Sequence, residues 1–600
     1  MTPGLVSLPP VPLVLINHDH MVFLPKSPIG GAMKGINDHQ TTVRVYPLDP
    51  MLLYLVPIIY LWDSILVGAV PQLPQNPRDF RINTTAHLIF NSVSGLLQHW
   101  PNTIYRNGHT FVPSTVPAGT LLYHSRQSFK PPPSPEFFAF DVDHSYIFCS
   151  VSPCVMYTYV PRRDLKLGYF DGTSAATLEG PRDLQDITFN GRFISIDEYD
   201  PWVHARNMCK WAKEVGLDGI IRMEPSFEAV LCNIDSDLHL VSSRELVYHQ
   251  TMFFPGQRAP GGSNSTLAAG AQLHPRLKKS APYLPGPIIP VYPPPLGWQG
   301  KQRTFADTAF ESIRAGMWHN HFPGESRIIL DYSGVVSAYD ETYTSLVHAR
   351  GGIPRSNHRL NGISANDTSR LKSEIEEVLK TGRSPAAVNW RSLFQDIIDR
   401  YAERLEDLRY LLRRSDLEPQ ATVAKARQRI LVMLTPYMGL PQTKFSGARV
   451  NPGEQQILYA GSHNARKSSP DDDWLIRIYD ACAKHPTIEF FRQRGFTAQE
   501  ERLVKSIDTV QGAICSSLIT IWATAFDSAE KPLFAERMVS EWRTEIENLM
   551  GWLDWHVWVK CDPPCSAGLQ CVLATWPWDV QIGDEDIGPM CKDQMSGDAF

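Results

Sequence analysis

Three short apolar runs, each carrying polar residues, constrain the fold of the first half of the chain most strongly. They cover residues 119–124 (GTLLYH), residues 137–146 (FFAFDVDHSY), and residues 217–221 (LDGII) with the following 227–231 (FEAVL). Such runs are typical of strands, and a polar residue at a strand end lies where a fold places a cleft. We therefore expect a sheet with several chemically reactive side chains along its edge.

Helix-like segments alternate with these runs. Residues 85–100 carry apolar side chains at helical spacing, and residues 201–216 form a second helix candidate with Gly216 as its stop. Alternation of this kind predicts an α+β domain at residues 81–250, built on a split, mixed or antiparallel sheet with helices.

The second half of the chain is predicted to be a mainly α-helical domain at residues 300–580. Residues 390–414 place six large apolar side chains on one face: Leu393, Ile397, Tyr401, Leu405, Leu408 and Leu412. The same pattern of apolar residues at helical spacing continues at residues 421–437, 474–484, 498–525 and 533–555. Long amphipathic helices joined by polar connectors indicate a helical bundle.

The remaining segments are predicted from their composition. Residues 1–50 are rich in Pro, Gly and His and are predicted to be a disordered tail. Residues 581–600 are predicted to be an acidic tail. Residues 251–299, rich in Pro and Gly, are expected to be a linker between the two domains.

Residues 51–70 form an apolar run of the length that crosses a bilayer. Pro57 and Asp63 argue for the alternative of a buried or amphipathic helix. Basic residues are slightly more frequent before the run than after it, so we expect a single-pass membrane protein with a lumenal or extracellular C-terminal part. Glycosylation triplets begin at Asn83, Asn264 and Asn366, all downstream of the run.

Charge and cysteine content limit the partners and the compartment. The net charge of −6 gives no general attraction to nucleic acid, and none is expected as a partner. The acceptor or protein partner is not specified by the sequence. Four of the ten cysteines, Cys561, Cys565, Cys571 and Cys591, lie near the C-terminus, which favours a disulfide-stapled cap over a zinc site.

The strand-like runs resemble the core of the ADP-ribosyltransferase superfamily. In that family a first strand ends in a tyrosine-histidine motif, a second unit supplies an aromatic or serine residue, and a late strand supplies the catalytic glutamate. The resemblance implies NAD as the cofactor, with His124 on its ribose and Tyr146 stacked on the nicotinamide. Glu228 would then be the catalytic carboxylate that stabilises positive charge on the sugar.

The same resemblance implies that Tyr123 and Ser145 help to bind the cofactor. The sequence departs from the family at Ser125, which stands where the family usually has glycine. It also lacks the serine-threonine-serine motif and a paired glutamate-x-glutamate, since Glu224 and Glu228 are four residues apart. These departures leave open whether such a domain is active.

A second interpretation uses Asp141 and Asp143. Four apolar residues followed by Asp-x-Asp resemble the metal-binding motif of nucleotide-sugar glycosyltransferases. That resemblance implies Mn²⁺ on both carboxylates, where it would stabilise a diphosphate leaving group. The protein would then be a lumenal, metal-dependent glycosyltransferase. His319 and His321 lack an evident third ligand and are expected to lie in a solvated loop.

A third interpretation is a non-enzymatic, membrane-tethered scaffold. The segments GTLLYH (residues 119–124) and WLDWHVWVKC (residues 552–561) resemble a family of uncharacterised fungal membrane-anchored proteins. This resemblance covers most of the chain after residue 80 and implies no established activity.

Overall fold

The computed structural model describes residues 14–17, 20–23, 85–149, 153–246, 305–380, 388–438, 473–492, 495–525, 532–573 and 588–593 of the 600. The chain divides into two compact units, Met1–Pro71 and Gln72–Phe600. In the first unit, β1 (Val14–Asn17) and β2 (His20–Phe23) form an antiparallel pair. This pair lies within the predicted tail, whose other residues are outside the described ranges.

The second unit contains a mixed ten-stranded sheet. Its strands are β3 (Thr110–Val116), β4 (Leu122–Arg126), β5 (Glu136–Ala139), β6 (Cys154–Pro161), β7 (Leu165–Phe170), β8 (Gly219–Met223), β9 (Phe227–Leu231), β10 (Leu238–Leu246), β11 (Ile329–Leu330) and β12 (Val336–Ser337). They follow the order β10-β6-β4-β5-β9-β8-β7-β3-β11, and β12 also pairs with β3. Neighbours are antiparallel except β7 and β8, which are parallel. The predicted α+β class is confirmed.

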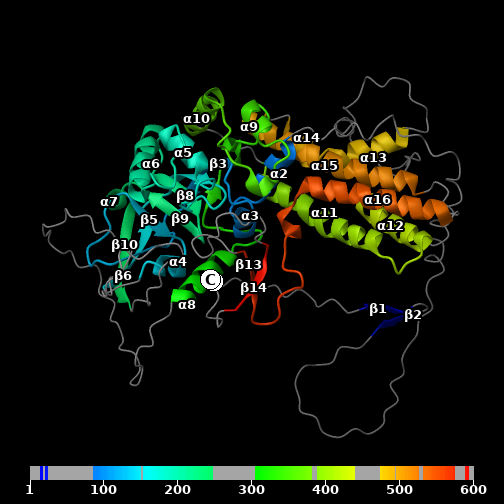
Figure 1. Ribbon diagram of the computed structural model, residues 1–600, viewed down its shortest axis with the longest axis horizontal. Helices are drawn as coiled ribbons and strands as arrows, with labels where there is room; N and C mark the ends of the chain where they lie inside the picture. Colours follow the sequence, from blue (N-terminus) through cyan, green and yellow to red (C-terminus); the bar gives the residue numbers. More distant parts are fainter. Residues whose placement is uncertain are drawn as a thin grey trace, which may run out of the picture. The chain divides into compact units, whose positions relative to one another are not determined.

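Helices cover one face of this sheet. They are α5 (Asp183–Asn190), α6 (Pro201–Val215) and α10 (Ala365–Lys380), seen above the strands in Figure 1. α6 begins where Asp200 caps the backbone of Trp202 and Val203, and it ends at Gly216, whose φ of 78° suits glycine. Its Met208 and Trp211 pack with Ile220 and Val230 of the sheet. The helix predicted at residues 201–216 is confirmed.

The opposite face of the sheet shares a hydrophobic core with the helical region. Phe138 and Tyr169 of the sheet belong to the same cluster of buried side chains as Phe394 and Trp555. α2 (Ala86–Ser94) links the two parts, because it packs against three long helices of the bundle, and the centroid of its Phe90 ring lies 4.9 Å from that of Phe394. The two halves of the second unit are therefore joined by continuous apolar contact.

The bundle is built from long helices that lie side by side in Figure 1. They are α11 (Trp390–Arg413), α12 (Pro419–Leu434), α13 (Asp473–Ala483), α15 (Ala498–Thr524) and α16 (Pro532–Leu553), and the short helix α14 (Pro486–Arg492) lies between α13 and α15 in the sequence. All six predicted apolar positions of α11 are buried. The predicted mainly helical C-terminal region is thus confirmed, and here the apolar faces of the helices are buried against one another.

Shorter helices complete the second unit. They are α3 (His99–Ile104), α4 (Val142–Tyr146), α7 (Ile234–Asp237), α8 (Phe305–Met317) and α9 (Thr344–Ala349). A small hairpin of β13 (Gln570–Val572) and β14 (Met590–Lys592) follows the bundle. The β14 strand falls inside the segment that was predicted to be an acidic tail.

The chain returns to the sheet after the expected linker. β11 and β12 lie beyond residues 251–299, and both pair with β3. The linker itself is outside the described residues. The sheet therefore takes strands from both sides of the linker, and residues 81–250 do not contain all of it.

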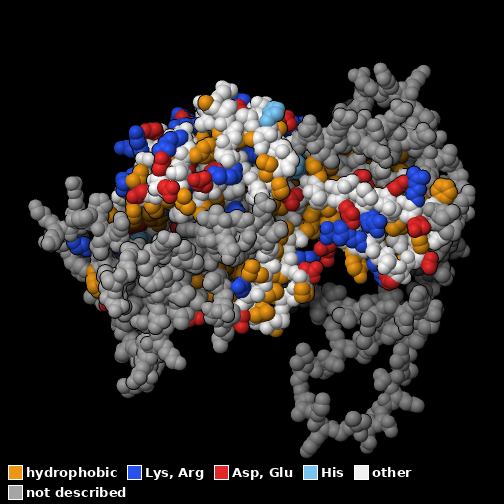
Figure 2. Space-filling view, viewed as in Figure 1, with side chains coloured by type: hydrophobic (Ala, Val, Ile, Leu, Met, Phe, Trp, Pro, Cys, Tyr) orange, Lys and Arg blue, Asp and Glu red, His pale blue; other side chains and the backbone are white. Residues whose placement is uncertain are grey.

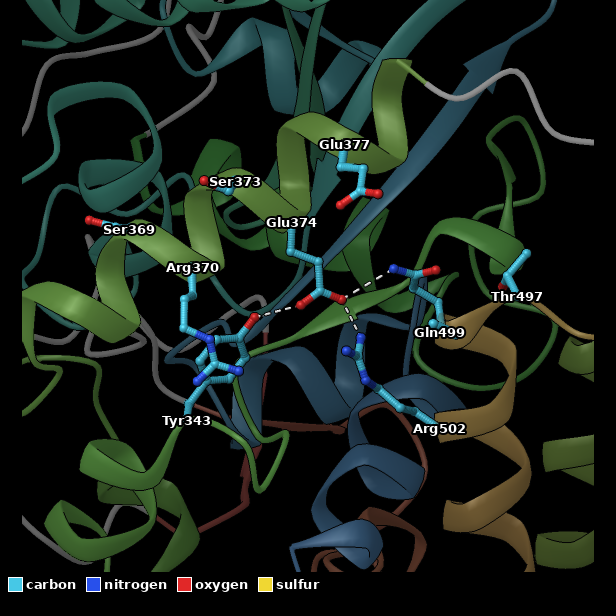
Figure 3. Close-up of a pocket in the computed structure, with 10 residues that line it drawn as sticks. Tyr343, Ser369, Arg370, Ser373, Glu374, Glu377, Thr497, Gln499 and Arg502 are labelled. Atoms are coloured by element: carbon cyan, nitrogen blue, oxygen red, sulfur yellow. Dashed lines mark hydrogen bonds and ion pairs between the residues drawn. The ribbon is translucent and has the colours of Figure 1, made fainter.

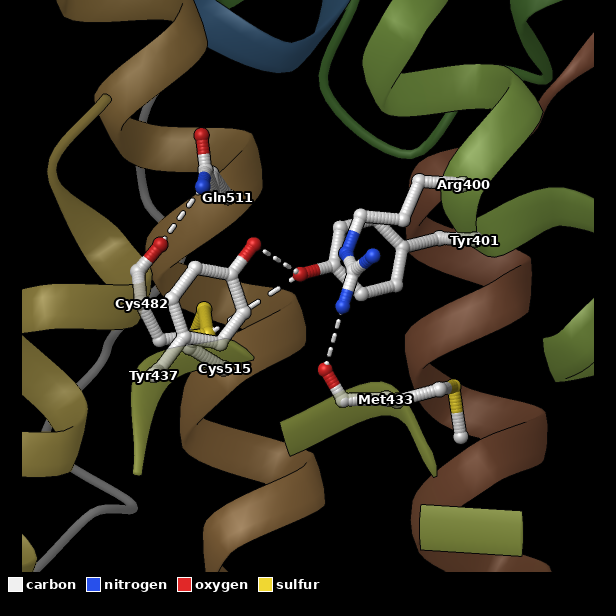
Figure 4. The surroundings of a disulfide bond; sticks show 7 residues. All are labelled: Arg400, Tyr401, Met433, Tyr437, Cys482, Gln511 and Cys515. Carbon is white, nitrogen blue, oxygen red and sulfur yellow. Dashed lines mark hydrogen bonds between the residues drawn. A yellow bond between two sulfur atoms is a disulfide. The ribbon is translucent and has the colours of Figure 1, made fainter. Parts of the chain in front are cut away.

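Five disulfides pair all ten cysteines of the chain. They are Cys149–Cys154, Cys209–Cys232, Cys482–Cys515, Cys561–Cys571 and Cys565–Cys591. The last two confirm the predicted C-terminal disulfide cap. Cys482–Cys515 joins α13 to α15 inside the bundle, where Tyr401 and Tyr437 share a hydrogen bond of 3.0 Å beside it (Figure 4).

The surface of the described bundle carries both signs of charge. Figure 2 shows Lys and Arg side chains interleaved with Asp and Glu side chains there. Exposed pairs such as Arg413–Glu547 and Lys560–Glu406 contribute to this pattern. Within the described ranges, no helix is long and apolar enough to cross a membrane. Residues 51–70, where a span was predicted, lie outside those ranges.

Candidate functional site

The strand register places His124 and Glu228, two of the predicted site residues, on opposite faces of the sheet. Tyr123 pairs with Ala139, which pairs with Glu228, which in turn pairs with Arg222. Directly paired residues share a face, so Tyr123 and Glu228 point to the same side. His124, the next residue of β4, points to the other side because side chains alternate along a strand.

His124 lies in a buried polar contact of its own. Its Nδ1 donates to the carbonyl oxygen of Phe137 at 2.8 Å, and its Nε2 lies 3.7 Å from Oε2 of Glu136. Burial lowers the pKa of His124 to about 4 and raises the pKa of Glu136 to about 7. Burial thus favours the uncharged form of each side chain.

Glu228 is held in a buried ion pair. Nε of Arg222 donates to Oε1 of Glu228 at 2.5 Å, and both side chains are less than 10% exposed. The guanidinium of Arg222 also lies 5.1 Å from the ring centroid of Phe137. The carboxylate that interrupts the apolar strand is therefore explained by its charged partner on β8.

Tyr146 and Ser145 lie on α4, a short helix after β5. Ser145 is buried, and its hydroxyl lies 3.1 Å from that of Ser125 on β4, while Tyr146 is half-buried. With His124 and Glu228 on opposite faces, the three proposed catalytic residues do not line one cleft. The structure gives no support to NAD binding by these residues, and the assignment stays a prediction from resemblance.

Asp141 lies between β5 and α4 but does not cap the helix. It occupies the N-cap position without a side-chain hydrogen bond to the helix backbone. Its Oδ2 instead accepts a hydrogen bond of 2.9 Å from the hydroxyl of Ser226, in the turn between β8 and β9. Asp143 lies in the first turn of α4, so the two carboxylates of the Asp-x-Asp motif are on different elements.

The cluster around Asp141 is completed by residues from the far side of the linker. Nε2 of His319 lies 3.8 Å from Oδ2 of Asp141 and 3.4 Å from Oε2 of Glu325. Ligand atoms of these three side chains all lie within 4.8 Å of one another, a spacing that could hold a metal ion. Two carboxylates and an imidazole are suitable donors for a divalent transition metal.

Arg327 balances the negative charge of the two carboxylates in this cluster. Its guanidinium contacts Glu325 through Nε at 2.8 Å and Nη2 at 2.5 Å, while Nη1 donates to the carbonyl of Phe140 at 2.6 Å. The contact of Nη2 with Asp141 is longer, at 3.4 Å. Arg327 is therefore bound tightly to Glu325 and loosely to Asp141.

The electrostatics of the cluster follow from these contacts. Burial alone would raise the pKa of Asp141, but His319, Arg327 and Ser226 outweigh it and lower the pKa below its ordinary value. Burial alone would lower the pKa of His319, but Asp141 and Glu325 raise it. The surroundings thus favour the charged forms of Asp141 and His319.

The segment that carries His319 and Glu325 is attached to the turn between α2 and α3. The backbone nitrogen of His99 donates to the carbonyl of His319 at 2.7 Å, and that of Glu325 donates to the carbonyl of Leu97 at 2.7 Å. Gly324 has a φ of +63°, and a Cβ there would lie 2.0 Å from the oxygen of Leu97. Only glycine permits this close approach, which places Glu325 fully buried beside Asp141.

The prediction of a solvated loop is wrong for His319, whose side chain is only 14% exposed. Sequence reasoning missed Glu325 and Arg327 altogether. Their partner Asp141 is distant in the chain, because Arg327 comes 186 positions after it in the sequence. A short motif cannot reveal a cluster assembled over that separation.

A separate polar cavity lies where α10 meets the start of α15 (Figure 3). It has a volume of about 600 Å³. Glu374 is at its centre and accepts hydrogen bonds from Tyr343 at 2.7 Å, from Gln499 at 3.2 Å and from Arg502. The lining also includes Arg370 and Glu377, so its charges are balanced. The hydrogen bonds of Glu374 therefore join α10 to α15.

Part of the chain matches a family of known proteins. Residues 78–155 and 151–259 match the profile of a family described as the YPL277C N-terminal domain. Uncharacterized protein YPL277C of Saccharomyces cerevisiae (strain ATCC 204508 / S288c) is 28% identical over 389 residues, which cover 55% of this chain and 76% of the relative. Uncharacterized protein YOR389W of the same yeast is 28% identical over 388 residues, which cover 55% of this chain and 59% of the relative. No solved structure matched.

The chain is similar to uncharacterised fungal proteins. This similarity supports the expected relationship to an uncharacterised fungal family and provides no support for the ADP-ribosyltransferase resemblance. The matched residues include Asp141 and the strands from β3 to β10. His319, Glu325 and Arg327 lie beyond the residues matched by the family profile.

Proposed function

We propose that the protein binds a divalent transition-metal ion, with Mn²⁺ as the first candidate, through Asp141, His319 and Glu325. The observation that carries this proposal is the convergence of their ligand atoms within 4.8 Å. Carboxylate oxygens suit Mn²⁺ and Mg²⁺, and an imidazole nitrogen adds preference for transition metals. The glycosyltransferase interpretation also makes Asp141 a metal ligand, but together with Asp143. In the proposed site the other ligands are His319 and Glu325.

The burial of the ligands supports a cation. Glu325 is fully buried, and the Asp141 side chain is only 23% exposed. Two carboxylates in such surroundings need positive charge nearby, because each loses much of its hydration. In the metal-free protein, Arg327 and a protonated His319 can supply that charge. A bound ion would replace the proton of His319.

The neighbouring guanidinium of Arg327 suits an oxygen-rich, anionic ligand. It contacts Asp141, whereas the buried Ser226 hydroxyl donates its proton to Asp141 and holds that side chain in place. When bound, a divalent ion would supply Lewis-acid attraction for a phosphate or carboxylate oxygen. Arg327, which is 31% exposed, could donate to the same ligand. This chemistry is compatible with metal-dependent transfer to or from a diphosphate.

Mn²⁺ binding to the full-length protein tests the proposal. After treatment with EDTA and desalting, free Mn²⁺ can be counted by electron paramagnetic resonance during a titration. We expect one bound ion, and we expect Asp141→Asn and His319→Gln to weaken binding at least tenfold. Asp143→Asn is the matched control and should bind like the wild type.

Two results would overturn the metal proposal. One is an absence of Mn²⁺ binding to the wild-type protein when its circular dichroism shows a folded chain. The other is equal binding by the wild type and Asp141→Asn. A loss of binding in Asp143→Asn alone would instead favour the Asp-x-Asp interpretation.

A further inference from the structure

The cysteines indicate the compartment in which the chain folds. All ten are paired, and the pairs are distributed over the sheet, the bundle and the C-terminal hairpin. Disulfides of this number persist in oxidising compartments and are rare in the reducing cytosol. The eukaryotic compartment that forms disulfides is also the one that attaches N-linked sugars.

One glycosylation triplet lies within the described residues, at the start of α10. It consists of Asn366, Asp367 and Thr368. Asn366 is exposed, whereas Asp367 is buried and accepts hydrogen bonds from the hydroxyl and the backbone nitrogen of Ser345. The helix is thereby oriented with the asparagine outward.

The helical spacing confirms which side of α10 is open. Leu371, Ile375 and Val378 are buried, and they contact the helices that cover the sheet. Asn366 is three residues before Ser369 and seven before Ser373, and both of these serines are exposed. Residues at these separations share a face, so the Asn366 side chain projects from the solvent side of the helix.

We propose that Asn366 carries an N-linked oligosaccharide. In the transfer, Nδ2 of Asn366 attacks the anomeric carbon of a lipid-linked diphosphate oligosaccharide, supplied by the cell. The bond from that carbon to the diphosphate oxygen breaks, the lipid diphosphate leaves, and the amide loses one proton. The glycan then stands beside the polar cavity, because Ser369 and Ser373 of the same face line it.

Site-resolved peptide mapping tests this assignment. The full-length chain is expressed in yeast from its own sequence, purified and treated with an endoglycosidase that leaves one N-acetylglucosamine on each occupied asparagine. We expect the peptide with Asn366 to carry this residual sugar in most molecules. Asn366→Gln and Thr368→Ala should reduce occupancy to zero.

Thr368→Ser is the matched control. It retains the glycosylation triplet and a hydroxyl that can replace the 2.9 Å hydrogen bond from Thr368 to the carbonyl of Ser364. Occupancy should therefore remain near the wild-type value. An unmodified Asn366 in the wild-type protein would overturn the proposal, whether or not Asn83 or Asn264 is modified. Sugar retained on this peptide in Thr368→Ala would also overturn the triplet-dependent assignment.

Discussion

Arg222 and Glu228 form a buried ion pair on neighbouring strands, with Nε of Arg222 2.5 Å from Oε1 of Glu228. Removing one partner of such a pair leaves the other charge buried and unpaired. We therefore expect Glu228→Leu to reduce the free energy of unfolding by about 3–5 kcal/mol, measured by urea denaturation. The double variant Arg222→Met with Glu228→Leu should recover most of this loss.

The exposed pair of Arg192 and Glu198 provides the control for that experiment, because these side chains are 64% and 55% exposed. Glu198→Leu should change the free energy of unfolding by less than about 1 kcal/mol. Equal effects of Glu228→Leu and Glu198→Leu would contradict the structural role assigned to Glu228.

Arg327 should oppose the binding of a cation. Its Nη2 lies 3.4 Å from Oδ1 of Asp141, so its charge repels any ion that binds between Asp141 and Glu325. Arg327→Gln is expected to tighten Mn²⁺ binding about tenfold, which corresponds to about 1.4 kcal/mol. Arg413→Gln, on the exposed face of the bundle, should leave the dissociation constant unchanged. Weaker binding in Arg327→Gln would argue against this site.

The disulfide between α13 and α15 should contribute strongly to stability. Cys482 and Cys515 are 33 residues apart in sequence, and the chain-entropy relation gives about 4 kcal/mol for a loop of that length. Replacing both by alanine should therefore lower the denaturation midpoint. The shorter Cys561–Cys571 loop, with a separation of 10, should contribute about 1 kcal/mol less. A larger loss from the shorter loop would show that packing, rather than loop closure, dominates.

Five histidines should make the fold sensitive to acid. Burial lowers the pKa to about 4 for His99, His124 and His358 and to about 3 for His204 and His556. The unfolded chain binds these protons near pH 6.5 and the folded chain does so only near pH 3–4. The contribution of these five histidines to stability is therefore fully present above pH 6.5 and is lost as the pH falls towards 4.

A single substitution tests this acid dependence. His204→Gln removes one titrating group and retains a polar side chain near Gln185, whose Oε1 lies 3.1 Å from Nε2 of His204. Urea unfolding between pH 7 and pH 5 should show a slope that is shallower by up to about 1.4 kcal/mol per pH unit. An unchanged slope would mean that His204 does not remain neutral in the folded protein.

Local patterns in the sequence predicted the long helices of the bundle well, whereas the helix expected at residues 85–100 ends at Ser94. The helix predicted at residues 390–414 is α11 (Trp390–Arg413), and that predicted at residues 498–525 is α15 (Ala498–Thr524). Both are recognised because burial on one face imposes a 3.6-residue period on the chain itself. Thr497 and Glu500 also form a capping box at the start of α15, a signal contained in four residues.

The candidate site could be predicted only in part. Asp141 was recognised because it follows an apolar strand, and its location at the end of β5 agrees with that expectation. Its partners could not be recognised, since nothing local in the segment of His319 and Glu325 indicates which strand it will reach. Conversely, the assignment of Glu228 as a catalytic group is a prediction from resemblance, whereas its ion pair with Arg222 is visible only in the tertiary structure.

The sequence by itself determined the elements: which segments become helices and strands, where α6 stops, and which cysteines gather near the C-terminus. These features depend on side chains that are close together along the chain. The tertiary structure alone decided which charged side chains meet. Strand order places β5 beside β9, the register separates His124 from Glu228, and the return of the chain after residue 300 brings His319 to Asp141. Each of these contacts depends on the pairing of distant segments, which no local pattern encodes.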